Sequence, residues 1–175
     1  MPKKDIGTQQ EFELRNRPLF VQDLFPSTDL QTFEKMIEKD IYPQRMVFYG
    51  KPGLGKTTLA HIIVSHILKL SQEERGSLVL QKNTHSILNY YEADFAMNPR
   101  AEYASHVAEL IQSVVSSSGI FGPQRYVFLL EEFTQLQKET QKRLIKLVSD
   151  HSRDDVFVII TTNDIHKIES SMGDR

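Results

Sequence analysis

A short glycine-rich segment carries the residues best suited to bind phosphate. It reads Gly50-Lys51-Pro52-Gly53-Leu54-Gly55-Lys56-Thr57, which has glycine, lysine and threonine at every defined position of a phosphate-binding loop, and Thr58 follows it. Glycines let such a loop turn its backbone N–H groups toward phosphate oxygens, and the positive end of a following helix adds to the attraction. Lys56 is expected to reach the β- and γ-phosphates, and the Thr57 hydroxyl is expected to bind Mg²⁺. Residues 50–58 therefore predict a site for ATP with magnesium, and the alternative is a plain strand-turn-helix connection.

Two adjacent acids close an apolar run further along the chain. Residues 126–130 are continuously apolar, and Glu131 and Glu132 follow them. A strand of this kind delivers both carboxylates to its carboxyl end. There Glu131 would help to hold the hydrated Mg²⁺, and Glu132 would orient and polarise an attacking water. The alternative is that both acids are solvated where the strand meets water.

A third candidate is the amide of Asn163, which follows a run rich in β-branched residues. An amide at the end of that strand is suited to hydrogen-bond a γ-phosphate or the attacking water. Asparagine is also a common turn residue, so the position alone leaves both interpretations open.

A parallel sheet would bring these candidates together. Apolar runs predict strands at 46–49, 87–92, 126–130 and 156–161, and helical spacing predicts helices within 27–40, 56–70, 103–116 and 136–148. Strands that alternate with helices pair in parallel through right-handed crossovers, which predicts a three-layer α/β/α fold. Ligands bind beyond the carboxyl ends of such strands, so Gly50, Glu131 and Asn163 should converge. Residues 71–85 read as a polar connection with room for one short extra element.

The overall composition is that of an ordinary globular domain. Hydrophobic residues make up 39% and charged residues 25% of the chain, and the formal net charge of -2 argues against a whole-surface nucleic-acid binder while permitting a local basic stripe. The absence of cysteine excludes disulfides and thiolate metal sites and fits a reducing compartment. The six histidines show no metal-ligand spacing with acids. We expect residues 1–17 to form an arm and residues 18–175 to form the domain. The chain shows neither a signal peptide nor a membrane span, so we expect it in the cytoplasm.

Taken together, these segments resemble an AAA+ ATPase of the P-loop NTPase class, and within it the clamp-loader subunits related to replication factor C and the bacterial DNA polymerase III gamma/tau subunit. The resemblance covers most of the chain. It includes Arg17-Pro18, followed by Asp23-Leu24, the segment that in this family lies near the adenine. It makes Asn163 the sensor 1 residue of the family.

The resemblance also extends to the last residues of the sequence. Lys167-Ile168 and Asp174-Arg175 fall where clamp loaders carry a lysine-isoleucine pair and a serine-arginine-cysteine motif. By this resemblance Arg175 would reach the γ-phosphate bound by a neighbouring subunit. The family implies a strand order of 5-1-4-3-2 with a fifth strand and a helical lid after the arginine. We therefore expect either a fragment of a longer subunit or a truncated relative completed by a partner.

Three residues depart from the family pattern. Glu131 stands where aspartate is usual, Thr134 replaces a second aspartate, and Asp174 replaces serine. The first substitution leaves open a structural subunit that binds the nucleotide without hydrolysing it. Another AAA+ DNA machine, such as a helicase loader, is a further alternative.

The resemblance implies a set of macromolecular partners. They are other clamp-loader subunits in an oligomer, a sliding clamp and primed DNA, which places the chain in the cytoplasm or with the nucleoid or nucleus, away from membranes. Arg100, Lys142 and Lys146 are candidates to contact the DNA phosphates, with Lys138 and Arg143 on the same basic helix. The alternative is that this basic helix is a solvated face.

Overall fold

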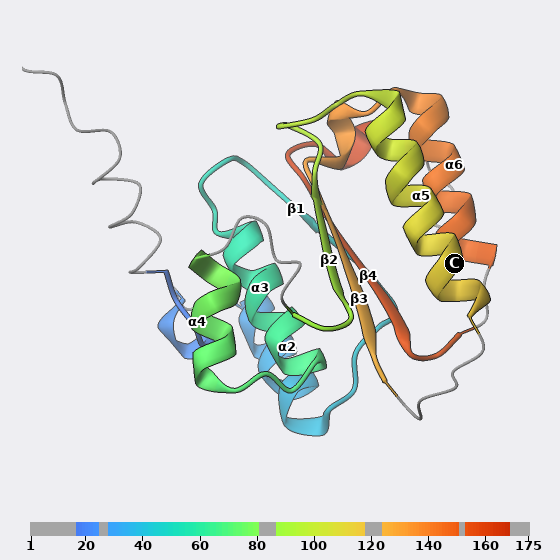
Figure 1. The fold of residues 1–175 in the computed structure, drawn as a ribbon. Coiled ribbons are helices and arrows are strands. Elements are labelled where there is room, and N and C mark those ends of the chain that lie inside the picture. Colours follow the sequence, from blue (N-terminus) through green and yellow to red (C-terminus); the bar gives the residue numbers. More distant parts are fainter. Residues whose placement is uncertain (1–16, 25–27, 81–86, 118–123, 151–152, 169–175) are drawn as a thin grey trace, which may run out of the picture.

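Four parallel strands form the centre of the fold (Figure 1). The computed structural model describes residues 17–24, 28–80, 87–117, 124–150 and 153–168. Within these residues the strands are β1 (Arg45–Tyr49), β2 (Tyr90–Asp94), β3 (Tyr126–Glu131) and β4 (Val156–Thr162), in the order β1-β4-β3-β2. Neighbouring strands pair in parallel throughout. This confirms the predicted parallel sheet. The expected position of a fifth strand lies after Arg175, outside the described residues.

Helices cover both faces of the sheet and complete the predicted three-layer arrangement (Figure 1). One face carries α2 (Thr28–Lys39), α3 (Lys56–Ile67) and α4 (Gln72–Leu80), and the other carries α5 (Ala101–Ser116) and α6 (Lys138–Asp150). Short 3-10 helices are η1 (Val21–Asp23), η2 (Phe133–Gln135) and η3 (Ile165–Lys167). Among the described residues, none of the helices combines the length and apolar character that crossing a membrane requires.

The central strands β3 and β4 are apolar throughout because both of their faces are covered. Successive side chains point to opposite faces of a strand. Val127 and Leu129 therefore belong to the core under α3, whereas Phe128 and Leu130 belong to the core under α5 and α6. Every residue of β4 is buried. These two cores fix the strand ends, so the polar residues that follow the strands gather at one edge of the sheet.

Two element boundaries differ from those expected. The second strand begins at Tyr90 rather than residue 87, since Asn89 has a left-handed backbone (φ 67°) that ends a turn, and Leu88 is exposed. The helix after Gly55 ends at Ile67 rather than near residue 70, and Lys69 beyond it is left-handed (φ 55°).

The helix α4 is the short extra element for which the expected polar connection at residues 71–85 left room. Its start is a capping box: the Ser71 N–H donates to Glu74 Oε2 at 2.8 Å, and the Glu74 N–H donates to Ser71 Oγ at 3.3 Å. Leu78 is its buried anchor in the core under α3. The helix is short and mostly polar, so its apolar periodicity is weak.

An ion-pair cluster connects three segments at the amino ends of the strands. Arg125 donates from Nη1 to Asp40 Oδ1 at 2.6 Å and from Nη2 to Asp40 Oδ2 at 3.1 Å, and Lys69 Nζ lies 3.0 Å from Asp40 Oδ2. These hydrogen bonds lower the pKa of Asp40 from 3.8 to about 2, and the one from Arg125 has the largest effect. Because the pKa is lowered by folding, the cluster stabilises the fold fully above a pH of about 4 and loses this contribution as the pH falls through about 2.

Replacing Asp40 with asparagine should test this cluster, because asparagine tolerates the left-handed backbone (φ 51°) at this position. We expect the free energy of unfolding at neutral pH to fall by up to about 1 kcal/mol, a modest value because the pair is partly exposed. Urea denaturation should show that the difference from wild type shrinks as the pH is lowered from about 4 toward about 2. Glu109→Gln, on an exposed part of α5, is the matched control. An equal loss in the control, or a difference independent of pH, would contradict the assignment.

Candidate nucleotide site

Residues 50–58 connect β1 to α3 as a tight loop. Gly53 and Gly55 have φ angles of 81° and 80°, in the left-handed region where a side chain is strained. Gly55 is the N-cap of α3, so Lys56, Thr57 and Thr58 form its first turn. The loop thus has the shape that its glycines predict, and it presents the positive end of a helix at the carboxyl edge of the sheet.

Lys56 is the centre of a hydrogen-bond chain that joins three strand ends. Its Nζ donates to the backbone oxygens of Gly50 at 2.9 Å and Lys51 at 3.0 Å, and to Asn163 Oδ1 at 2.8 Å. Asn163 Nδ2 in turn donates to Glu132 Oε2 at 2.8 Å. Because β4 lies between β1 and β3, Asn163 stands between the loop after β1 and the acid after β3. The structure therefore brings together Lys56, Asn163 and Glu132, residues that lie far apart in the sequence.

Glu132 has an unusual backbone conformation for a residue with a side chain. Its φ and ψ angles are 49° and 43°, and its N–H donates to Thr161 Oγ1 on β4 at 3.2 Å. Conformations of this kind cost on the order of 1–3 kcal/mol and are concentrated at functional sites. The strained turn directs the Glu132 carboxylate to Asn163, on the side of the site that holds Lys56.

Glu131 lies on the face of β3 that packs against α3. Its pKa is raised, first by burial and then by the charge of Glu92, while a hydrogen bond with Thr57 acts in the opposite direction. Its Oε1 is buried and has no hydrogen-bond partner within the described part of the chain. A carboxylate with an unsatisfied oxygen next to a threonine hydroxyl offers the oxygen ligands that Mg²⁺ prefers. Thr57 and Glu131 therefore fit the predicted magnesium ion.

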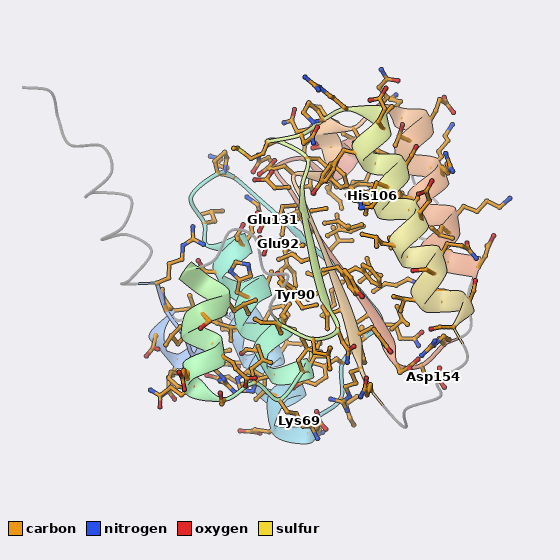
Figure 2. All side chains as sticks on the ribbon, in the orientation of Figure 1. Lys69, Tyr90, Glu92, His106, Glu131 and Asp154 are labelled. Atoms are coloured by element: carbon orange, nitrogen blue, oxygen red, sulfur yellow. The ribbon has the colours of Figure 1, made fainter. Side chains whose placement is uncertain are left out.

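His61 and Glu92, which no sequence motif assigned to a site, lie beside Glu131. His61 Nε2 is 3.4 Å from Glu92 Oε2, and the Tyr90 hydroxyl donates to the same oxygen at 2.9 Å. Figure 2 shows Glu92 and Glu131 close together on neighbouring strands. No local spacing indicates this cluster. One signal in the sequence could have indicated His61: it lies four residues, or one helical turn, after Thr57, so the two side chains share one face of α3.

The Arg17-Pro18 segment lies next to the helix that follows the loop. Pro18 and Leu19 line a small pocket, whose other lining residues are His61, Ile62, Ser65, Arg75 and Leu78. The guanidinium of Arg75 lies 5.5 Å from the centre of the Phe20 ring. Arg17 is half-buried. A contact between this segment and a nucleotide stays a prediction.

The candidate DNA-contacting residues share one layer of the fold. Arg100 is exposed at the N-cap of α5, and Lys142 and Lys146 are exposed one turn apart on α6. Figure 1 shows α5 and α6 side by side on the face of the sheet opposite α3. Arg175 lies outside the described residues.

Comparisons with known proteins agree with this fold and loop. Residues 46–175 match the sequence profile of the "ATPase family associated with various cellular activities (AAA)". The DNA polymerase III subunit gamma/tau of Mycoplasma genitalium is 27% identical over 172 residues, which are 95% of this chain and 28% of that protein. The Holliday junction branch migration complex subunit RuvB of Campylobacter fetus is 36% identical over 67 residues, which are 35% of this chain and 20% of that protein.

A solved structure adds support for the fold. A mutant of RuvB from Thermotoga maritima superimposes with a TM-score of 0.51 and 16% identity, over 89% of this chain and 45% of that chain. The chain thus spans 28% of the gamma/tau relative and 20% of the RuvB relative from Campylobacter fetus.

Proposed function

Because this chain belongs to the ATPase family associated with various cellular activities, we propose that it binds and hydrolyses ATP as a subunit of an assembly that loads a sliding clamp onto primed DNA. The observation that carries the proposal is the hydrogen-bond chain from Lys56 through Asn163 to Glu132. It groups a cation, an amide and an acid, the side chains that phosphoryl transfer to water requires. The gamma/tau similarity over 95% of the chain supports the clamp-loader role.

The proposed binding step uses residues 50–58, with residues 18–175 acting as one nucleotide-binding unit. Backbone N–H groups of the loop and the amino end of α3 surround the phosphates. Lys56 exchanges its present acceptors for β- and γ-phosphate oxygens. Thr57 and Glu131 hold Mg²⁺, which when bound neutralises phosphate charge. Arg17 and Pro18 border the adenine.

The proposed hydrolytic step depends on Glu132 and Asn163. When Lys56 turns to the phosphates, Asn163 Oδ1 loses its donor while Nδ2 still holds the Glu132 carboxylate. Asn163 then faces the γ-phosphate or the attacking water, and Glu132 polarises that water. Arg175 of one subunit would stabilise the charge that develops at the γ-phosphate bound by its neighbour.

Two other functions remain as competitors. The 36% identity with RuvB over 67 residues favours an ATPase that acts on branched DNA. Glu131 in place of aspartate favours a structural subunit that holds ATP without hydrolysing it. In each case we propose a cytoplasmic or DNA-associated protein.

Primed DNA and four-way junction DNA should separate these candidates. We expect ATP hydrolysis by the chain, mixed with its partner subunits and a sliding clamp, to rise about tenfold when primed DNA is added. Four-way junction DNA should produce no comparable rise. A larger rise with the junction would support the RuvB-like function, and a rate unaffected by any DNA would support the structural subunit.

The same assay tests the DNA-contacting residues. A variant with Lys142→Glu and Lys146→Glu should need more primed DNA for half-maximal stimulation. The difference from wild type should shrink as salt is added, because wild type has more phosphate contacts and loses affinity faster with salt. The control is Lys35→Glu with Lys39→Glu, which makes the same charge change on exposed positions of α2, on the opposite face of the sheet. If both double variants respond alike, α6 is not the DNA-binding face.

A further inference from the structure

Three potential metal ligands converge beneath the phosphate loop. They are His61 on α3, Glu92 on β2 and Glu131 at the end of β3, and their ligating atoms all lie within 4.8 Å of one another. The His61 side chain is 5% exposed and that of Glu92 is 14% exposed. Figure 2 shows the two glutamates close together, on the side of the sheet that α3 covers.

The polar atoms of this cluster are incompletely satisfied. Three of its buried atoms have no hydrogen-bond partner within the described part of the chain: both ring nitrogens of His61 and the Oε1 atom of Glu131. A protonated imidazole would offset part of the negative charge of the carboxylates. It would form an ion pair with Glu92, whose Oε2 lies 3.4 Å from Nε2, but the Nδ1–H group would still have no acceptor in this geometry. Buried unpaired groups of this kind are rare.

We propose that His61, Glu92 and Glu131 form a binding site for a divalent transition-metal ion of the zinc class. One imidazole nitrogen and two carboxylate oxygens make a donor set that zinc accepts, with water in the fourth position. Two ligands at zinc bond lengths of about 2.1 Å lie about 3.4 Å apart in a tetrahedral arrangement. His61 Nε2 and Glu92 Oε2 are already 3.4 Å apart, and rotation of the Glu131 side chain brings in the third ligand.

The surroundings of Glu92 support a ligand role. The Tyr90 hydroxyl donates to Glu92 Oε2 at 2.9 Å, and Tyr90 is 3% exposed. A buried donor of this kind holds a ligating carboxylate in one orientation. Tyr90 thus positions Glu92 toward His61.

This site is chemically distinct from the magnesium site. Mg²⁺ prefers oxygen ligands and keeps several waters, whereas an imidazole ligand selects transition metals. Glu131 belongs to both sites. Zinc would therefore draw Glu131 away from Thr57 and slow ATP hydrolysis. This slowing rests on the proposed function, whereas the binding of zinc at the three ligands does not depend on it.

Cobalt titration of the nucleotide-free chain tests the proposal, because tetrahedral Co²⁺ absorbs visible light strongly. We expect one equivalent of Co²⁺ to bind, Zn²⁺ to displace it and excess Mg²⁺ to leave it in place. His61→Asn and Glu92→Gln should each lower the Co²⁺ affinity by at least about tenfold. His106→Asn, on the exposed face of α5, and Asp154→Asn, at another exposed position, are matched controls and should bind like wild type (Figure 2).

Thermal melting should accompany each titration, so that a misfolded variant is recognised. A wild-type chain that binds no Co²⁺ would overturn the proposal even if a variant failed to fold. So would folded His61→Asn and Glu92→Gln variants that bind Co²⁺ like wild type. Lys56→Ala should bind Co²⁺ like wild type, because Lys56 is not one of the three proposed ligands. Loss of ATP binding in this variant with Co²⁺ binding intact would show that the metal site and the nucleotide site can fail separately.

Discussion

Replacing Glu132 with glutamine should lower ATP hydrolysis by at least about 100-fold, the range for loss of a general base. The affinity for Mg-ATP should stay within about threefold of wild type, because the glutamine keeps the shape of the side chain and only the water-polarising charge is lost. The amide can still pair with Asn163, which now donates to Glu132 Oε2 at 2.8 Å. Steady-state hydrolysis with primed DNA, partner subunits and clamp measures the first effect, and equilibrium nucleotide binding measures the second.

The matched control for this change is Glu139→Gln, an exposed acid in the first turn of α6. It should hydrolyse ATP like wild type. If Glu132→Gln retained more than about a tenth of the wild-type rate, Glu132 would not be the general base. If both hydrolysis and affinity fell together, the change would have damaged binding instead.

Replacing Lys56 with alanine should weaken Mg-ATP binding by at least about 100-fold, because the lysine supplies charge-assisted hydrogen bonds to the β- and γ-phosphates. In the structure its Nζ donates hydrogen bonds to oxygen atoms of Gly50, Lys51 and Asn163. Phosphate oxygens would replace these acceptors, so the side chain needs little reorganisation. Binding at a concentration 100 times Kd stabilises a protein by about 2.7 kcal/mol. For a chain of this size that corresponds to a rise in Tm of about 5–10 °C.

Thermal melting with and without Mg-ATP measures this second effect. Wild type and Lys35→Ala, an exposed lysine on α2, should both show the rise in Tm. Lys56→Ala should show none at the same ATP concentration. A full rise in Lys56→Ala would mean that the nucleotide binds without the lysine and that residues 50–58 are not the triphosphate site.

The features that the sequence predicts well are contiguous in the chain. The phosphate loop is defined by eight consecutive residues, and the left-handed backbone of Gly53 and Gly55 follows directly from their lack of a side chain. The buried strands β3 and β4 are equally visible as apolar runs. The expected convergence of Gly50, Glu131 and Asn163 needed only the rule that ligands bind where parallel strands end at one edge. At that edge the structure joins Lys56, Asn163 and Glu132 by hydrogen bonds.

Other features depend on which residues face each other, and a single sequence does not contain that information. The cluster of His61, Glu92 and Glu131 requires the phase of α3 and the register that sets Asp94 opposite Glu131. The pair of Asp40 and Arg125 joins residues separated by 85 positions. The helix α4 is a different case, because its Ser71 and Glu74 capping pattern is present in the sequence. The helix has too few apolar residues at helical spacing for periodicity to predict it.

Isothermal titration calorimetry of wild type with Mg-ATP, alongside Lys56→Ala, tests most directly the claim that residues 50–58 are a triphosphate site. We expect a saturable isotherm with one site per chain for wild type, and no measurable saturation for the variant over the same range. Wild type that gives no saturable heat, or two isotherms that superimpose, would contradict the assignment of this loop.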